Sequence, residues 1–330
     1  MKIGIVGISG FGGSELLRLV LGHPTFKLVY GAGESTAGQK LSQRFPTLRG
    51  HPAGELTIES FRPAELSGID LLFASLPTGK SREPLGQVPA NVRIVDVGGD
   101  HRFVEGWTYG LTELPGARDR IRKATRLANP GCYPAAALLA LAPLVKAGLV
   151  EPEGIVIDAK SGVTGTGRGG ASGFGYVETS EDLFAYGLES HPHVPEIETA
   201  LSHVGGRKAT VAFTPHLVPM KRGLLATCYA RPKGNITAAT LQEAAEAMYK
   251  AEPFVRVLPA EKGRGPHTSA ASGSNFAFVS YAVNPNTGLV IALGAVDNLG
   301  KGAAGQALQN ANLMTGQPEM AGLAGMPLPA

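Results

Sequence analysis

The first twenty-one residues constrain the fold of this chain more than any other segment. An apolar strand pattern at Lys2–Val6 runs directly into the loop 7–13, which has the spacing G-x-x-G-x-x-G, and helix-type apolar spacing follows over residues 14–21. Glycines here let the backbone approach a pyrophosphate, and the amides of the following helix N-terminus favour an anion. A plain tight turn is the alternative interpretation of the loop. The order of strand, loop and helix favours a dinucleotide-binding domain.

Short strands alternate with helices through the first 130 residues. Further strands are predicted at residues 26–30, 56–61, 70–75 and 92–97. Strands that alternate with helices are typical of a parallel sheet with helices on both faces. We therefore predict an α/β protein that opens with a Rossmann-type doubly wound parallel sheet.

The pattern changes after residue 154, where the predicted strands become longer. They lie at residues 155–160, 209–214, 224–231, 275–283 and 289–296, with helices near residues 196–203 and 238–250. This order predicts an α+β domain with a mixed or antiparallel sheet. We assign residues 1–131 and 299–330 to a dinucleotide-binding domain and residues 132–298 to a catalytic and oligomerisation domain. A last helix at residues 303–314 is expected to pack back on the first domain, and we expect a homodimer or homotetramer.

Composition narrows the classes of function. The 30 basic and 27 acidic residues give a net charge of +3, and the basic residues are scattered, so we expect no nucleic-acid partner. No apolar run is long enough to span a bilayer and no signal-peptide pattern is present, so we expect no membrane association. Two cysteines in 330 residues argue against a disulfide framework or a thiolate zinc site. We therefore predict a cytoplasmic protein without a metal.

Cys132 is the first candidate for catalysis. It lies in the segment Asn-Pro-Gly-Cys-Tyr-Pro, residues 129–134, before a helix that is predicted to start near Pro134 and to be disturbed at Pro143. Unsatisfied amides at a helix start lower the pKa of a thiol and so supply the nucleophilic thiolate. The alternative is a small buried hydrophobic residue, which is how we interpret Cys228 in the apolar strand at residues 224–231.

A second candidate lies in the segment His-Pro-His-Val-Pro-Glu, residues 191–196. His193 and Glu196 stand three residues apart at a predicted helix start, where the carboxylate could orient the imidazole as a general acid or base. One alternative is zinc, for which the two clustered histidines lack a third ligand, and another is a pair of residues that only cap the helix. His216 is a weaker candidate, of structural or substrate-contacting type.

Three further features concern anionic ligands. The loop 161–170 is rich in Gly, Ser and Thr, and it could close over an anionic substrate or be only a connector. Arg102 and Lys221 lie in turn-like segments and could bind phosphate or carboxylate. Glu34 lies 21 residues after Gly13, where a carboxylate binds the ribose 2′-hydroxyl and favours NAD.

Together these motifs resemble the N-acetyl-gamma-glutamyl-phosphate reductase family, which is related to aspartate-semialdehyde dehydrogenase. The resemblance covers nearly the whole chain, and the cysteine motif is its most specific part. It depends on residues 7–18, 129–134, 161–168, 193–197 and 297–302. It implies an NADPH-dependent reduction of N-acetyl-gamma-glutamyl phosphate to N-acetylglutamate 5-semialdehyde, with release of phosphate, in arginine biosynthesis.

The resemblance also implies a role for each site residue. Cys132 is expected to be the nucleophile that forms a thioester. His193 is expected to be the acid–base residue, with Glu196 orienting it and His191 as the alternative acid–base residue. The residues expected to bind the cofactor are Gly7, Ser9, Gly10, Phe11, Gly12, Gly13, Ser35, Pro77, Gly79, Ser161, Gly162, Asn298 and Gly302. The residues expected to bind the substrate are Arg102, Asn129 and Lys221.

The segment after the second strand departs from the family pattern. The family often has Ser-Arg-Ser with a following Ala-Gly-Lys, whereas this chain has Gly-Glu-Ser-Thr-Ala-Gly-Gln over residues 33–39. A 2′-phosphate would then depend on Ser35, Thr36 and the shifted Lys40, and Glu34 would repel it. NADP(H) is the expected cofactor on family grounds, and NAD(H) is the alternative because of Glu34.

Two other functions are compatible with the pattern. Relatives in lysine biosynthesis reduce a carrier-protein-linked aminoadipyl or glutamyl phosphate, but they are expected to have Gly-Cys-Asn where this chain has Gly-Cys-Tyr-Pro. A non-catalytic NAD(P)-sensing regulator could use the same fold, but it does not need a cysteine at a helix start. A small-molecule acyl phosphate is therefore the favoured substrate.

Overall fold

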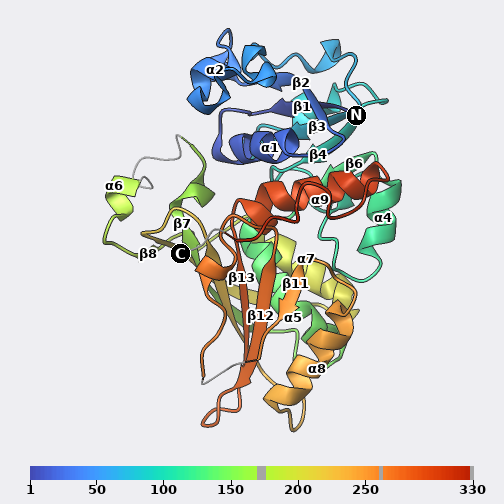
Figure 1. Cartoon of the computed structure of the whole chain (residues 1–330). Coiled ribbons are helices and arrows are strands. Elements are labelled where there is room, and N and C mark those ends of the chain that lie inside the picture. The colour runs from blue at the N-terminus through green and yellow to red at the C-terminus, as the bar shows by residue number, and fades with distance from the viewer. Residues whose placement is uncertain (169–175, 260–262, 328–330) are drawn as a thin grey trace. The chain divides into compact units, whose positions relative to one another are not determined.

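The chain folds into two units, which are best followed one at a time in Figure 1. The computed structural model describes residues 1–168, 176–259 and 263–327. Unit 1 comprises Met1–Thr112, Ala117–Pro130 and Ala303–Ala324, and unit 2 comprises Glu113–Gly116, Gly131–Gly302 and Gly325–Ala330. The chain therefore passes from unit 1 to unit 2 one residue before Cys132.

Unit 1 is built on a six-stranded sheet in which every pairing is parallel, with the order β2-β1-β3-β4-β6-β5. The strands are β1 Lys2–Val6, β2 Lys27–Ala32, β3 Leu71–Ala74, β4 Arg93–Asp96, β5 Thr108–Tyr109 and β6 Arg126–Ala128. Because the strand order reverses direction between β1 and β3, ligands are expected at the carboxyl ends of these two strands. The predicted Rossmann-type sheet is confirmed.

Five α-helices are described in unit 1. They are α1 Phe11–Leu21, α2 Leu41–Arg44, α3 Arg82–Gly86, α4 Ala117–Lys123 and α9 Gly305–Met314. Helix α1 buries Leu16, Leu17 and Val20, which follow the spacing of one helix face. Helix α9 packs against α1, α4 and β4, so the predicted return of the last helix to the first domain is confirmed.

Unit 2 contains a seven-stranded mixed sheet with the order β11-β12-β13-β10-β7-β9-β8. The strands are β7 Ile155–Gly162, β8 Phe184–Ala185, β9 Val211–Val218, β10 Leu224–Ala230, β11 Val255–Val257, β12 Ala277–Val283 and β13 Val290–Val296. The pairs β7/β9 and β11/β12 are parallel and the other pairs are antiparallel. The helices are α5 Cys132–Lys146, α6 Tyr176–Thr179, α7 His193–Gly205 and α8 Ala238–Tyr249.

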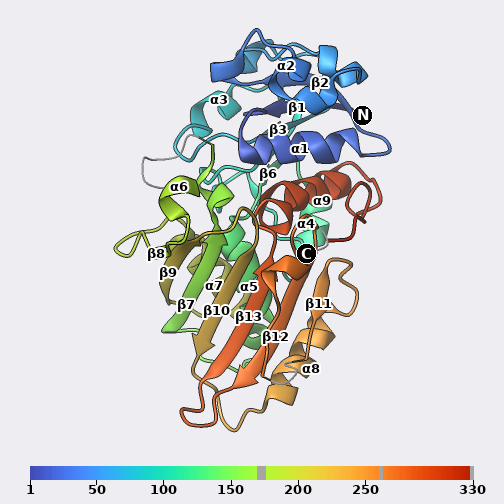
Figure 2. The ribbon, with the colours of Figure 1, turned by 60° about the vertical axis from the view of Figure 1, so that its left-hand side comes forward.

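One face of this sheet packs on helices. Figure 2 shows α5 and α7 behind the sheet, and α5 contacts β7, β10, β12 and β13. Alternate residues of β10 therefore point into the core, among them Cys228, which is fully buried. Burial raises the pKa of the Cys228 thiol, as expected for an inert hydrophobic cysteine. The predicted α+β domain with a mixed sheet is confirmed.

Helix α5 corrects the prediction made from its prolines. It begins at Cys132 and continues through Pro143 to Lys146, whereas the sequence predicted a start near Pro134 and a disturbance at Pro143. Proline has no N–H, so Pro143 cannot donate to the Leu139 carbonyl. The Tyr249 hydroxyl of α8 donates to that carbonyl at 2.7 Å. A side chain distant in sequence thus replaces the missing helix hydrogen bond.

The predicted strand at residues 56–61 is wrong. Only the isolated bridges Lys40–Thr57 and Ala32–Glu59 form there. The backbone groups of this segment bond to separate points of the chain, with Ile58 donating to Gln39 and Glu59 donating to Gly31. Residues 56–61 therefore form an irregular extended segment, because no single neighbouring strand pairs along them.

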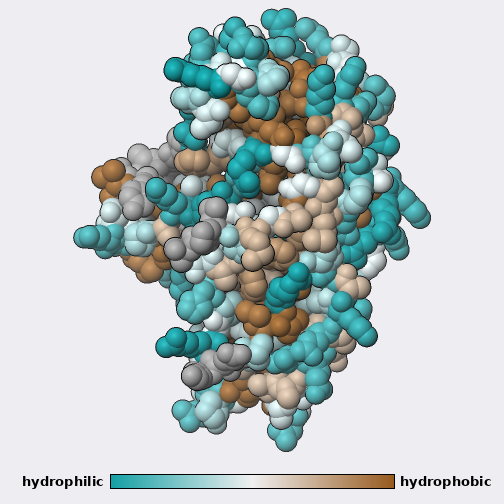
Figure 3. Space-filling model, viewed as in Figure 1, coloured by the Kyte–Doolittle hydropathy of each residue, from teal (hydrophilic) through white to brown (hydrophobic). Residues whose placement is uncertain are grey.

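No helix in the described ranges is long and apolar enough to cross a membrane. On the face shown in Figure 3, hydrophilic and hydrophobic side chains are interspersed.

Candidate active site

Cys132 occupies the first position of α5 and is partly buried. Gly131 precedes it as the N-cap, with φ −72° and ψ 160°. The first turn of α5 contains no acidic residue, and the rest of the helix is almost entirely buried. The first amides of a helix have no intrahelical acceptor, so the thiol lies in a region of positive potential on a rigid element. This environment is suited to a thiolate.

His193 lies against the residue that precedes Cys132. It is the first residue of α7, and it lies at the helix start that the sequence predicts for His193 and Glu196. A Cβ atom on Gly131 would lie 2.8 Å from Cδ2 and 2.9 Å from Cε1 of the His193 ring, and it would overlap Nε2. The backbone angles of Gly131 are open to any residue, so the imidazole is what requires glycine at this position. The structure thus brings the predicted acid–base residue to the cysteine loop.

Glu196 joins the same two helices. Its side chain is buried, and its Oε1 accepts a hydrogen bond from the Gly131 N–H at 2.9 Å. Since Glu196 is one turn after His193 on α7, this bond fixes the start of α7 against the start of α5. The sequence predicted an orienting carboxylate, but the backbone partner could not be inferred from spacing.

His191 lies one residue before Pro192, the N-cap of α7, and belongs to a cluster of rings. Its Nδ1 accepts the N–H of His193 at 3.2 Å, which requires that this nitrogen has no proton. Its ring centroid lies 4.7 Å from that of His193 and 5.1 Å from that of Phe213. These contacts make His191 a support for His193.

Two tyrosines that sequence reasoning did not single out complete this cluster. The Tyr133 hydroxyl donates to the His216 carbonyl at 2.9 Å, and the Tyr186 hydroxyl donates to Tyr133 at 3.3 Å. Burial raises the pKa of Tyr133 and raises that of Tyr186 to about 12, so both stay neutral. The ring of Tyr133 lies 5.9 Å from that of His193, centroid to centroid. In the sequence, only the position of Tyr133 next to Cys132 indicates that it belongs to the site.

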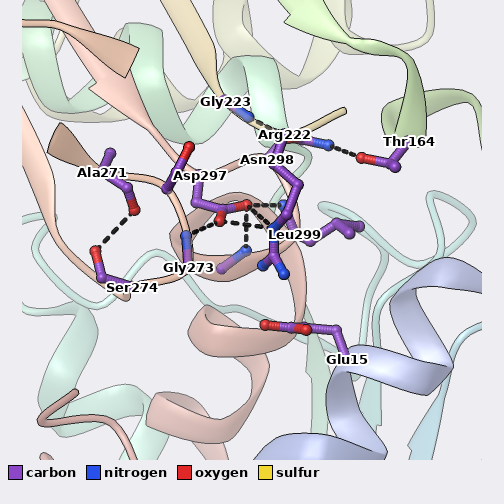
Figure 4. A network of polar contacts seen from close by, with 12 residues as sticks. Glu15, Thr164, Arg222, Gly223, Ala271, Gly273, Ser274, Asp297, Asn298 and Leu299 are labelled. Carbon is purple, nitrogen blue, oxygen red and sulfur yellow. Dashed lines mark hydrogen bonds and ion pairs between the residues drawn. The ribbon is translucent and has the colours of Figure 1, made fainter. Parts of the chain in front are cut away.

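The loop 297–302 approaches Cys132 from the end of β13. A Cβ atom on Gly302 would lie 2.8 Å from the Cys132 Cβ, so only glycine allows this approach. Figure 4 shows how Asp297 fixes the loop. Its buried carboxylate accepts the N–H of Leu299 at 2.8 Å and the Arg222 Nε at 2.9 Å.

Asn298 holds two other loops with its side chain. Its Oδ1 accepts the Gly223 N–H at 2.8 Å, and its Nδ2 donates to the Thr164 hydroxyl at 2.8 Å (Figure 4). Both ends of this buried amide are therefore used within unit 2. We interpret Asn298 as the residue that positions these loops.

The predicted residues Ser161, Gly162 and Lys221 lie at the same edge of the sheet in unit 2. Ser161 is buried at the end of β7, and a Cβ on Gly162 would meet the backbone of residues 220–222. Lys221 has an exposed side chain, and its carbonyl accepts the Thr164 hydroxyl at 2.7 Å. Residues 169 and 170 of the predicted loop 161–170 lie outside the described residues.

The glycine loop of unit 1 fits a dinucleotide pyrophosphate. Gly7 has a φ of +74°, and a Cβ on Gly13 would overlap the Gly7 carbonyl oxygen, so loop and helix pack backbone to backbone. The first helical hydrogen bond of α1 runs from the Ser14 N–H to the Gly10 carbonyl at 2.9 Å. No acidic residue occupies the first turn of α1, which begins at Phe11, so its positive end is left for an anion. Gly12 also lies within this first turn.

The segment after β2 forms the 3-10 helix Glu34–Thr36. Glu34 and Ser35 are exposed, and Thr36 is buried. The Thr36 hydroxyl lies 2.9 Å from that of Ser9 in the glycine loop. Lys40 forms an exposed ion pair with Glu55 at 2.6 Å.

Pro77 and Gly79 lie in a turn after β3, the strand beside β1. The Asp100 carboxylate accepts the N–H of Gly79 at 2.6 Å and that of Ser81 at 2.8 Å. Burial raises the pKa of Asp100, but the hydrogen bonds from Gly79, Ser81 and Arg82 outweigh this and lower it below its ordinary value. An ionised Asp100 thus fixes the turn at the carboxyl end of β3.

Arg102 and Asn129 meet just before the cysteine loop. The Arg102 Nε donates to the Asn129 carbonyl at 3.0 Å. Asn129 is fully buried, and its side chain donates to Ala303 and accepts from Asn310, each at 3.0 Å. These contacts make Asn129 a structural support of the segment 129–134. Arg102 is only partly buried. In the described parts of the chain, no cluster of three His, Cys, Asp or Glu side chains could hold a metal ion.

Comparison with known families agrees with this arrangement. Residues 2–124 match the semialdehyde dehydrogenase NAD binding domain, and residues 132–298 match the semialdehyde dehydrogenase dimerisation domain. The solved aspartate semialdehyde dehydrogenase II of Vibrio cholerae, complexed with ASA, superposes with a TM-score of 0.73. It is 17% identical and aligns over 95% of this chain and 98% of its own, which shows the shared fold.

Curated relatives are similar over the full length. The N-acetyl-gamma-glutamyl-phosphate reductase of Bradyrhizobium sp. strain BTAi1 is 57% identical over 99% of both chains. The probable chloroplastic N-acetyl-gamma-glutamyl-phosphate reductase of Arabidopsis thaliana is 40% identical over 99% of this chain and 85% of its own. This chain therefore belongs to the N-acetyl-gamma-glutamyl-phosphate reductase family of the semialdehyde dehydrogenases.

Proposed function

We propose that this enzyme reduces N-acetyl-gamma-glutamyl phosphate to N-acetylglutamate 5-semialdehyde and phosphate, with NADPH as the reductant. The observation that supports this most is the placement of His193 against Gly131, next to a cysteine at a helix start. The names of the full-length relatives support the substrate. The proposed setting is arginine biosynthesis in the cytoplasm, with a homodimer or homotetramer formed through the dimerisation domain.

Cys132 is the proposed nucleophile. Its thiolate attacks the carbonyl carbon of the acyl phosphate, the bond between that carbon and the phosphate oxygen breaks, and phosphate leaves with the electron pair. The helix N-terminus stabilises the thiolate before the attack and the negative oxygen that develops during it. The product of this step is a thioester on Sγ of Cys132.

A reduced nicotinamide, when bound, supplies the hydride that the thioester carbon accepts. The loop 7–13 is proposed to bind the pyrophosphate, and the turn with Pro77 and Gly79 to contact the same ligand. Asp297 and Asn298 hold the loop that carries Gly302 beside Cys132. The loop 297–302 is thus proposed to position the acyl group on Cys132.

His193 is proposed to manage the proton. As a base it receives the Cys132 proton, and as an acid it protonates the oxyanion that hydride addition leaves on the thioester carbon or the departing thiolate. His191 and Glu196 hold its helix in place through the hydrogen bonds at 3.2 Å and 2.9 Å. Arg102 and Lys221 are the proposed partners of the substrate's negative groups.

The reverse reaction provides the test. Phosphate-dependent oxidation of N-acetylglutamate 5-semialdehyde is followed by the absorbance of the reduced nicotinamide, with NADP and NAD in parallel. We expect activity in the wild type and loss of at least 10³-fold in Cys132→Ser. No activity from folded wild type with either cofactor would refute the substrate assignment.

A further inference from the structure

The ribose side of the glycine loop has a basic residue that the sequence pattern did not reveal. Arg44 ends α2, and its Nη2 donates to the Ser9 carbonyl at 3.3 Å. The Ser9 hydroxyl lies 2.9 Å from that of Thr36. The last residue of the 3-10 helix after β2, Thr36, and the last residue of α2, Arg44, therefore both contact Ser9.

The guanidinium of Arg44 has no carboxylate partner among the described residues. Its contacts are the long hydrogen bond to Ser9 and the ring of Phe45, whose centroid lies 5.3 Å from Cζ. A guanidinium has five N–H donors, so most remain available for a ligand. Lys40, the basic residue suggested by the sequence, is held by Glu55 at 2.6 Å. Among the described residues of this region, Arg44 is thus a cation that contacts the glycine loop without being paired to a carboxylate.

The Glu34 carboxylate contacts the irregular extended segment at residues 56–61. Its Oε1 accepts the Phe61 N–H at 3.0 Å, so one carboxylate oxygen is bound to the backbone of residue 61. The Ser35 hydroxyl is exposed on the same 3-10 helix. A hydroxyl and a guanidinium are the groups that commonly bind a phosphate monoester beyond the second strand.

We propose that Arg44, with Ser35, recognises the 2′-phosphate of NADP(H) and makes this enzyme prefer NADP(H) over NAD(H). The inference rests on the proposed function, because it assigns the cofactor of that reaction. The basic residue comes from α2 instead of the segment 33–39, where the family pattern has its arginine and where this chain has none. Arginine can bind phosphate with two parallel hydrogen bonds, which a lysine cannot reproduce.

Nucleotide fragments test the inference without turnover. The dissociation constants of adenosine 2′,5′-bisphosphate and adenosine 5′-monophosphate are measured by calorimetry on the full chain. The variants are Arg44→Gln, Arg44→Lys and Lys40→Gln, with Arg49→Gln as the matched control because Arg49 is an exposed arginine of the same segment.

We expect the wild type to bind the bisphosphate about 10- to 100-fold more tightly than the monophosphate. Arg44→Gln should lose most of this difference and bind the monophosphate within twofold of the wild type, which also shows that the variant is folded. Arg44→Lys should keep part of the preference, and Arg49→Gln should keep all of it. If Arg44→Gln does not fold, the test is made with Arg44→Lys. An undiminished preference for the bisphosphate in Arg44→Lys would contradict bidentate recognition by Arg44.

Two results would overturn the inference, namely no preference in the wild type or an undiminished preference in Arg44→Gln. If Lys40→Gln loses more of this preference than Arg44→Gln does, Lys40 binds the 2′-phosphate and the assignment to Arg44 is wrong. These outcomes leave the reductase reaction untouched. Conversely, a preserved preference in an enzyme that does not act on the semialdehyde would refute the proposed function alone.

Discussion

Replacing Gly131 by alanine tests the geometry of the proposed site with a single methyl group. The backbone of Gly131 has a φ of −72°, so alanine introduces no conformational strain. The new Cβ would overlap the His193 ring, with Cδ2 at 2.8 Å and Cε1 at 2.9 Å. The substitution therefore displaces the imidazole and leaves its chemistry intact.

The size of the effect follows from these distances. Nonbonded carbon atoms pack at about 3.5–4.0 Å, so the ring must retreat by about 1 Å. A displacement of about 1 Å in a catalytic group costs about 10²-fold in rate, which corresponds to about 2.7 kcal/mol of transition-state stabilisation. We therefore expect kcat/KM for the semialdehyde to fall about 100-fold in Gly131→Ala.

The assay is the phosphate-dependent oxidation of the semialdehyde, with thermal unfolding measured on the same samples. Gly86→Ala is the matched control, because a Cβ there meets nothing within 4 Å. It should keep full activity. Near-wild-type activity of folded Gly131→Ala would refute the argument that His193 acts from this position.

Three further perturbations concern groups that the structure buries. Tyr249→Phe leaves the Leu139 carbonyl without its donor and should lower the free energy of unfolding by about 1–3 kcal/mol, measured in urea. Lys301→Met removes the ammonium that pairs with the buried Glu113 carboxylate and should cost about 3–5 kcal/mol, whereas the double variant with Glu113→Leu should recover most of it. Burial lowers the pKa of His23, so below about pH 6.5 the unfolded chain binds more protons than the folded chain. Lowering the pH should therefore destabilise the wild type, and the loss of stability should be less steep in His23→Gln.

Each of these expectations has its own control. Tyr229→Phe removes a partly exposed hydroxyl and should change stability by less than about 0.5 kcal/mol. A double variant no more stable than Lys301→Met alone would show that the loss comes from packing instead of charge. An identical pH dependence in wild type and His23→Gln would remove His23 from the account of acid sensitivity.

The sequence predicted best where a long periodic segment or a specific motif was present. The loop 7–13 follows a strand and opens a helix as predicted, because glycine spacing and apolar periodicity both act locally. The strands β5 and β6 have two and three residues, which is too short for a period, and they were not predicted. The hydroxyl that replaces the missing N–H of Pro143 in α5 comes from Tyr249, more than a hundred residues away in the sequence.

The candidate site divides in the same way. Cys132 and His193 were identifiable because each stands in a motif at a predicted helix start. Their proximity depends on the packing of α5 and α7, and a single chain's spacing does not encode it. Arg44 gave no signal because it ends a helix of only four residues, so its contact with Ser9 emerges from the fold alone.

The central claim is that the acyl group is transferred to Cys132. Enzyme mixed with N-acetyl-gamma-glutamyl phosphate in the absence of nicotinamide is quenched in acid and analysed by whole-protein and peptide mass spectrometry. We predict one acyl adduct on the Cys132 peptide, which hydroxylamine removes, which added NADPH discharges and which Cys132→Ala does not form. Reductase activity retained in Cys132→Ala, or stoichiometric phosphate release without an adduct, would contradict the account.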